Sequence, residues 1–162
     1  MKENEVRFKT DCILVSKTDT KGQIIYANEA FIAISGYSEK DLLGKPHKII
    51  RHEKMPRIIF KLLWEYIGSG EEMNAYFINK TKQGRFYWVY ANITGSKDNN
   101  GNLIGYHSSR TEPRVEALEV IIPLYEKLLS LEQSSGIDAS KAYLNKLLSE
   151  KGTRYEEYVL SI

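Results

Sequence analysis

The chain has 162 residues, of which 42% are hydrophobic and 27% are charged, so it can bury a core and does not have the composition of a disordered protein. Its formal net charge of +2 is too small to indicate nucleic acid or an anionic membrane as the main partner. The single cysteine, Cys12, excludes an internal disulfide framework and a cysteine-based zinc site, and it fits a reducing compartment.

The N-terminal segment, residues 1–12, lacks the apolar stretch of a signal peptide, and we expect it to form a short cap segment before the first domain. No run in the chain approaches the roughly 20 apolar residues of a membrane-spanning helix. These two observations predict a cytoplasmic protein.

Two β-rich runs within residues 13–28 open the predicted domain. Lys21 and Gly22 lie between them and have turn chemistry, which predicts a β-hairpin. Asn28 fits the N-cap of a helix over residues 29–35, where apolar side chains recur at helical spacing.

The segment at 46–60, PHKIIRHEKMPRIIF, combines two histidines with several basic residues. Pro56 suits the first position of a helix, and an apolar stripe follows it. The stripe consists of Ile59, Phe60, Leu63, Trp64 and Ile67. The basic residues between 45 and 61 recur every three or four positions, which is typical of a solvated helix face, with phosphate binding or an acidic partner as alternatives.

Three further β-rich runs, at 72–81, 85–94 and 102–111, are separated by turn-forming segments. The order of the elements predicts an α+β domain over residues 13–111. In it, a five-stranded antiparallel sheet has one face covered by helices. A small ligand would bind between the sheet and the helices.

Residues 112–162 are predicted to form a C-terminal tail of amphipathic helices. Pro123 predicts a kink in the first helix, and Asp138 or Ser140 is expected to cap the second. The narrow apolar stripes favour packing on the domain or on a second copy of the chain, and docking to another protein is the alternative.

Four segments together resemble a PAS domain of the type found in bacterial aerotaxis receptors, and the resemblance runs from about Leu14 to Tyr125. The matching segments are YANEAFIAISGYSEKDLLGKPH, IIRHEKMPRIIFKLLWEYIGSG, INKTKQGRFYWVYANIT and GYHSSRTEP. The patterns PH-x-x-x-RH and YWV-x-AN are specific to this branch. The chain is also similar to the stand-alone PAS proteins of bipartite energy-taxis systems, the Cet type.

The resemblance implies a redox sensor that binds FAD and relays its redox state to a membrane chemotaxis transducer. It also implies a homodimer or a hetero-oligomer with another PAS protein. The flavin-binding residues that it implies are Asn28, Arg51, His52, Trp64 and Asn79.

The chemistry of these side chains suits that ligand. Arg51 can donate bidentate hydrogen bonds to a pyrophosphate. Trp64 can pack against an isoalloxazine ring, and Asn79 or Asn92 can pair with its polar edge.

Two alternatives stay open. Lys54 stands where the family has an acidic residue and Met73 where it has tryptophan, and both favour a cofactor-free dimerisation or scaffold module. Haem requires only one axial histidine, so a haem sensor is also compatible with His47 and His52, although His47 is expected to be a capping or turn residue.

The histidines and scattered carboxylates do not form a set of three or four ligands, so we expect no metal-ion site. The sequence contains no nucleophile with an associated base and no glycine-rich phosphate loop, so we expect no enzymatic activity. Cysteine-based photochemistry is not expected either, because Cys12 precedes the first strand.

Overall fold

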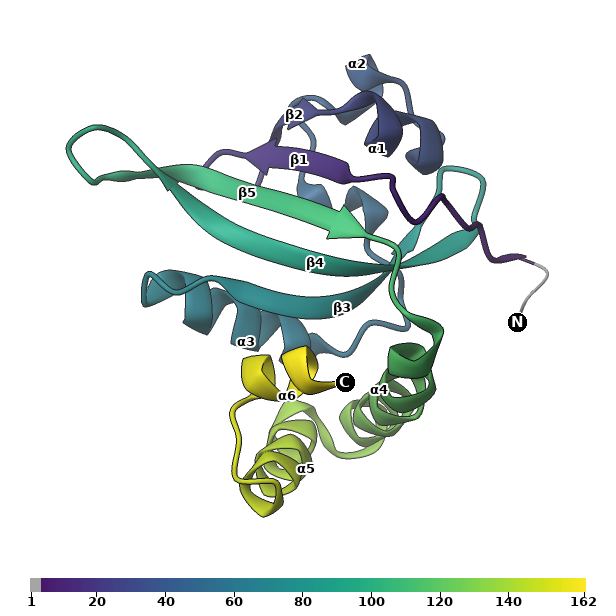
Figure 1. The fold of residues 1–162 in the computed structure, drawn as a ribbon, viewed down its shortest axis with the longest axis vertical. Coiled ribbons are helices and arrows are strands. Elements are labelled where there is room, and N and C mark those ends of the chain that lie inside the picture. The colour runs from purple at the N-terminus through teal and green to yellow at the C-terminus, as the bar shows by residue number, and fades with distance from the viewer. Residues whose placement is uncertain (1–3) are drawn as a thin grey trace.

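A five-stranded antiparallel sheet, in the order β2-β1-β5-β4-β3, forms the centre of the computed structural model, which describes residues 4–162 (Figure 1). Its strands are β1 (Leu14–Thr18), β2 (Ile24–Ala27), β3 (Met73–Lys80), β4 (Phe86–Lys97) and β5 (Leu103–Thr111). The predicted α+β class and the five-stranded sheet are therefore confirmed. Residues 1–3 of the predicted cap segment lie outside the described residues.

The first two strands form the expected hairpin. The Asp19 carboxylate accepts hydrogen bonds from the backbone N–H groups of Lys21 and Gln23, both at 2.9 Å. Gly22 takes a left-handed conformation with φ of +81°, which glycine adopts without the steric cost that a Cβ would add. The turn prediction is confirmed.

Four helical elements connect β2 to β3: α1 (Glu29–Ser35), α2 (Glu39–Leu42), the 3₁₀ helix η2 (His47–Ile50) and α3 (Arg57–Gly68). Asn28 is the N-cap of α1, as predicted, and its side chain accepts from Phe31 N at 3.0 Å. The same amide accepts from Val15 N at 3.1 Å and donates to Ile13 O at 2.8 Å. One side chain therefore both caps α1 and ties it to β1.

The tail forms three helices, α4 (Val115–Ser135), α5 (Ile137–Glu150) and α6 (Tyr155–Ser161), which lie against β3 and α3 (Figure 1). Pro123 lies inside α4, whose helical assignment continues through it. The predicted cap of α5 is wrong, because Gly136 takes that position and the Ser140 hydroxyl donates to Glu132 at 3.1 Å. Helix α6 was not predicted.

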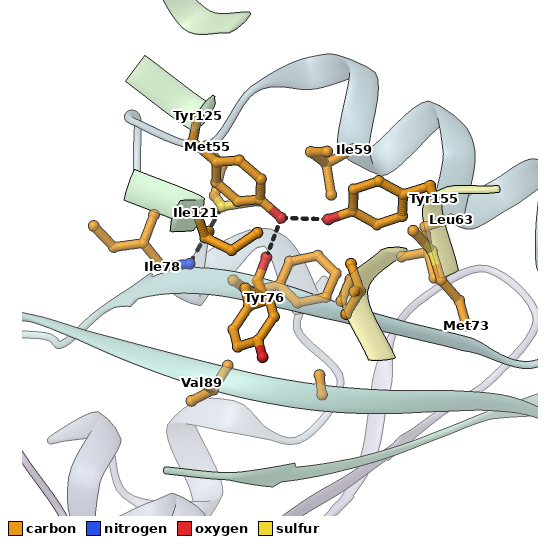
Figure 2. Packing of buried hydrophobic residues seen from close by; sticks show 14 of the residues in the cluster. Met55, Ile59, Leu63, Met73, Tyr76, Ile78, Val89, Ile121, Tyr125 and Tyr155 are labelled. Carbon is orange, nitrogen blue, oxygen red and sulfur yellow. Dashed lines mark hydrogen bonds between the residues drawn. The ribbon is translucent and has the colours of Figure 1, made fainter. Parts of the chain in front are cut away.

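Strand β3 is at the edge of the sheet, yet all its residues except Lys80 are buried. The Tyr125 hydroxyl of α4 donates to the carbonyl of Tyr76 at 2.7 Å and lies 2.6 Å from the Tyr155 hydroxyl (Figure 2). The sulfur of Met55 accepts from Ile78 N at 3.2 Å. An exposed edge strand would present unpaired backbone groups, so these side chains close it.

Candidate functional site

A cavity of about 250 Å³ lies between the inner face of the sheet and the helical segment η2–α3. The wall on the sheet side includes Phe77, Ala91 and Ile93, and the helix α3 contributes Phe60, Leu63, Trp64 and Ile67. Such apolar walls with a few polar groups are typical of sites for flat organic ligands.

A polar cluster of Arg110, Ser16 and His47 lies at one end of this cavity. Arg110 is 2% exposed, and its guanidinium donates to Ser16 Oγ at 2.7 Å. The imidazole Nε2 of His47 lies 2.8 Å from the same hydroxyl oxygen and 3.4 Å from Arg110 Nη1. Phe31 packs against both, with its ring 4.4 Å from Arg110 Cζ and stacked on the imidazole.

Of the two titratable groups in this cluster, one is neutral and the other is positively charged at neutral pH. Burial, reinforced by the positive charge of Arg110, lowers the pKa of His47 to about 3, so its imidazole is neutral. Burial lowers the pKa of Arg110 to about 10, so its guanidinium stays charged. Within residues 4–162, no carboxylate forms an ion pair with Arg110, and none lines the cavity. The cavity therefore contains a positive charge without a protein counter-ion.

The depressed pKa of His47 predicts a pH-dependent stability. Unfolding exposes an imidazole with a pKa near 6.5, so between pH 6.5 and about 3 the unfolded state binds a proton that the native state does not. The His47 contribution is complete above pH 6.5 and decreases below it, by at most about 1.4 kcal/mol per pH unit. Urea unfolding of wild type and His47→Gln at several pH values should show a shallower acid slope in the variant. Equal slopes would contradict this assignment.

One buried donor in the lining, Nε of Arg110 on β5, lacks a hydrogen-bond partner among the described residues. Nδ2 of Asn79, a residue 6% exposed on β3, has only a weak contact, with the Tyr87 hydroxyl opposite it on β4. Buried donors without acceptors are costly and rare in native proteins. Both atoms are closed off from solvent, so a ligand in the cavity would reach them only after the lining side chains shift.

Cationic and aromatic side chains mark the mouth of the cavity. Lys21, Lys48 and Arg51 are exposed lining residues, and Trp64 is 50% exposed with its ring against Tyr106. The Arg51 guanidinium lies 3.6 Å above the Phe60 ring, and the Arg51 backbone forms an isolated bridge with Asn79. The mouth therefore combines positive charge with an aromatic surface, which suits an anionic group outside a flat ring.

The structure brings three of the five predicted site residues to the cavity, namely Arg51, Trp64 and Asn79. Asn28 is outside the lining and has the capping role described above. His52 is also outside it. Its Nδ1 accepts from Lys54 N at 3.1 Å, and its ring meets Phe86 edge-on.

Asn92 does not have the expected role at a ring edge. It lies in the register of β3 and β4 opposite Asn74, and its amide donates to Glu72 and Asn74, both at 3.0 Å. Ala91 and Ile93, its neighbours along β4, line the cavity instead. Because side chains alternate along a strand, Asn92 faces away from the cavity.

Arg110 is the main cavity residue that sequence reasoning missed, and His47 was considered only as a haem ligand or as a capping or turn residue. His47 does open a helical turn, as expected, but its ring lies in the cavity and is not simply a solvated turn side chain. Arg110 shares its face of β5 with Tyr106 and Ser108, which also line the cavity. The period-two spacing of these three residues was the signal that could have identified Arg110.

The basic residues between 45 and 61 do not share one helix face. They are distributed over a loop, η2 and α3, and only Lys48 and Arg51 among them line the cavity. Lys54 and Met73, which favoured a cofactor-free module, are also outside the lining. Lys54 is exposed before α3, and Met73 is fully buried at the start of β3.

A family model described as the PAS fold matches residues 24–110, which is more than half of the chain. The chain belongs to the PAS family. The aerotaxis receptor of Escherichia coli K12 is 35% identical over 143 residues, which cover 86% of this PAS protein and 28% of the receptor. A nitrogen fixation regulatory protein of Klebsiella oxytoca is 31% identical over 94 residues, covering 58% of this chain and 19% of that protein.

The solved dark-state structure of the Aureochrome1 LOV photoreceptor shares the fold, with a TM-score of 0.59 and 21% identity. That match covers 68% of this PAS protein and 82% of the photoreceptor chain. The resemblance to aerotaxis-receptor PAS domains is thus confirmed, while the chain spans less than a third of the two curated relatives.

Two further structural findings concern membranes and metal ions. From residue 4 to residue 162, no helix has the length and apolar character needed to cross a membrane. Over the same range, no three His, Cys, Asp or Glu side chains gather where they could hold a metal ion.

Proposed function

We propose that this PAS protein is a cytoplasmic redox sensor for energy taxis. It binds FAD without a covalent bond in the cavity, relays the redox state to a membrane chemotaxis transducer, and catalyses no reaction on a substrate. The observation that carries the proposal is the cavity itself. Apolar walls surround a buried arginine that has no counter-ion among the described residues, and the mouth is cationic.

Each part of that cavity suits one part of FAD. The apolar walls and the aromatic mouth can hold the isoalloxazine ring, whose polar edge can accept hydrogen bonds from Asn79 and Arg110. The exposed Lys21, Lys48 and Arg51 can meet the pyrophosphate. The bound flavin would supply reversible electron acceptance with a change in protonation and hydrogen bonding.

Residues of the chain can then transmit that change from the cavity to the surface of the protein. Arg110 keeps a positive charge beside the ring, while neutral His47 and Ser16 hold the guanidinium in place. The amide of Asn79 can exchange partners, and its strand, β3, is the strand on which the tail packs. A change in the cavity can therefore reach the surface that a transducer or a second PAS copy would contact.

The two alternatives explain fewer of these features. A cofactor-free module would leave the buried charge of Arg110 without a counter-ion among the described residues, and the two substitutions that favoured it are outside the cavity. A haem would need a nitrogen of His47, but its Nε2 is engaged with Ser16 and lies next to a cationic guanidinium.

The absorption spectrum of the freshly purified protein tests the proposal. We expect the two visible bands of a flavin, whereas a Soret band would show haem. A colourless protein that also fails to take up added FAD would refute the redox-sensor proposal. Tighter binding of FAD than of FMN would support the role of the cationic mouth.

Substitutions at the mouth test the site. Arg51→Ala and Trp64→Ala should each weaken FAD binding about tenfold or more, because each removes a charged or aromatic contact. Lys54→Ala is the matched control, since it removes a nearby positive charge from outside the lining and should leave affinity within about twofold. Full retention of FAD in both mouth variants would refute the assignment.

A further inference from the structure

A carboxylate from the tail caps the helix that covers the cavity. Glu132 of α4 is 6% exposed, and its two oxygens accept from the backbone N–H groups of Arg57 at 2.8 Å and Ile58 at 2.9 Å. Ser140 of α5 donates to the same carboxylate at 3.1 Å, and the Arg57 guanidinium lies 3.7 Å away. Three helices therefore meet at one buried anion.

The first N–H groups of helix α3 depend on this contact for their hydrogen-bond acceptors. The first N–H groups of a helix have no partner within it and usually pair with a nearby Ser, Thr, Asp or Asn. The N-cap of α3 is Pro56, which provides no side-chain hydrogen bond. Glu132, 75 residues further along the chain, supplies the acceptor and places a negative charge at the positive end of the helix dipole.

The same helix contributes one wall of the cavity. Phe60, Leu63, Trp64 and Ile67 all belong to α3 and line it, and the first of them is two residues after Ile58. Helices α4 and α5 also contact α3. A shift of the N-terminal turn of α3 would therefore move that wall.

We propose that Glu132 is a positioning residue for the cavity and that it couples docking of the tail to binding of the cavity ligand. The proposal rests on the proposed function, in which that ligand is FAD. FAD bound in the cavity would hold α3 through its lining side chains, and Glu132 holds α3 through the N–H groups of its first turn. Because coupling between two binding equilibria is reciprocal, FAD should strengthen tail docking as much as tail docking strengthens FAD binding.

Besides the contact of Glu132 with α3, the tail also contacts the sheet. This separate contact provides a matched control. Tyr125 bonds to the backbone of β3 and packs on Trp88, and it makes none of the hydrogen bonds that hold the cap of α3. Glu132→Ala should weaken FAD binding about tenfold, whereas Tyr125→Phe, which loosens the tail without touching the cap of α3, should weaken it by no more than about threefold. Glu132→Gln retains one acceptor oxygen, so its FAD affinity should lie between those of wild type and Glu132→Ala.

The two tryptophans of the chain report on the two contacts. In protein labelled with 5-fluorotryptophan, ¹⁹F NMR should show Glu132→Ala shifting the Trp64 resonance and Tyr125→Phe shifting the Trp88 resonance. Hydrogen exchange should show that FAD protects the amides of Arg57 and Ile58 in wild type and protects them less in Glu132→Ala.

Unchanged FAD affinity together with an unchanged Trp64 signal in Glu132→Ala would overturn the proposal. Equal loss of affinity in Glu132→Ala and Tyr125→Phe would overturn it as well, since the effect would then follow stability and not the cap. Failure of wild type to bind FAD would refute the proposed function instead. The Trp64 resonance of the flavin-free protein would still decide whether Glu132 positions α3.

Discussion

Replacing Arg110 with methionine should stabilise the flavin-free protein and weaken flavin binding. The guanidinium is almost fully buried and no carboxylate of the described chain pairs with it, so the folded apoprotein bears its desolvation cost. Methionine fills similar space without a charge. We expect the free energy of unfolding to rise by about 1–3 kcal/mol, within the range seen when buried ionic groups are replaced by apolar ones.

Flavin affinity should change in the opposite direction. A hydrogen bond from a charged donor contributes about 1.5–3 kcal/mol, so its loss should weaken FAD binding about 10- to 100-fold. Arg110→Lys is the control, because it retains the charge and its cost but lacks the planar set of donors. Urea unfolding and flavin titration measure the two effects. A less stable apoprotein in Arg110→Met would show instead that Arg110 mainly supports Ser16, His47 and Phe31.

Truncating Tyr125 to alanine should cause the largest loss of stability among these variants, about 3–5 kcal/mol. The ring is 2% exposed and packs on Trp88, and its hydroxyl joins Tyr76 of the sheet to Tyr155 of α6. Tyr125→Phe retains the ring but leaves a buried carbonyl and a buried hydroxyl with one partner fewer. It should cost about 1–3 kcal/mol.

Unfolding in urea gives both values, and light scattering should show association of Tyr125→Ala, because the edge of β3 becomes accessible. Tyr143→Ala on α5 is the control. Its side chain is 39% exposed, so we expect a change within about 0.5 kcal/mol. A Tyr125→Ala protein within about 1 kcal/mol of wild type would contradict the role of the tail in closing the sheet.

The sequence predicted the elements well where local chemistry determines them. The N-cap at Asn28 and the turn at Gly22 depend on residues close in the chain, and the structure confirms both. Helix α6 has only seven residues, and two of its three buried residues, Tyr155 and Tyr158, are tyrosines, so its apolar pattern was too short to recognise.

The candidate site was harder to predict because it depends on contacts between distant segments. Whether Arg110 faces the cavity is decided by the pairing of β5 with β1 and β4, since a shift of one residue would turn it outward. Glu132 is a charged residue in an amphipathic helix, and only the position of α3 shows why it is buried. The family resemblance supplied Arg51, Trp64 and Asn79, but it did not indicate these two.

Closure of the β3 edge also constrains how this protein can assemble. At the opposite edge, Ile24 of β2 donates to Lys45 O at 2.9 Å and accepts from Gly44 N at 2.8 Å, so that edge is covered as well. Each outer strand of the described sheet therefore has part of its outer backbone already paired within the chain. At these positions a strand from a second copy could not extend the sheet by β-augmentation.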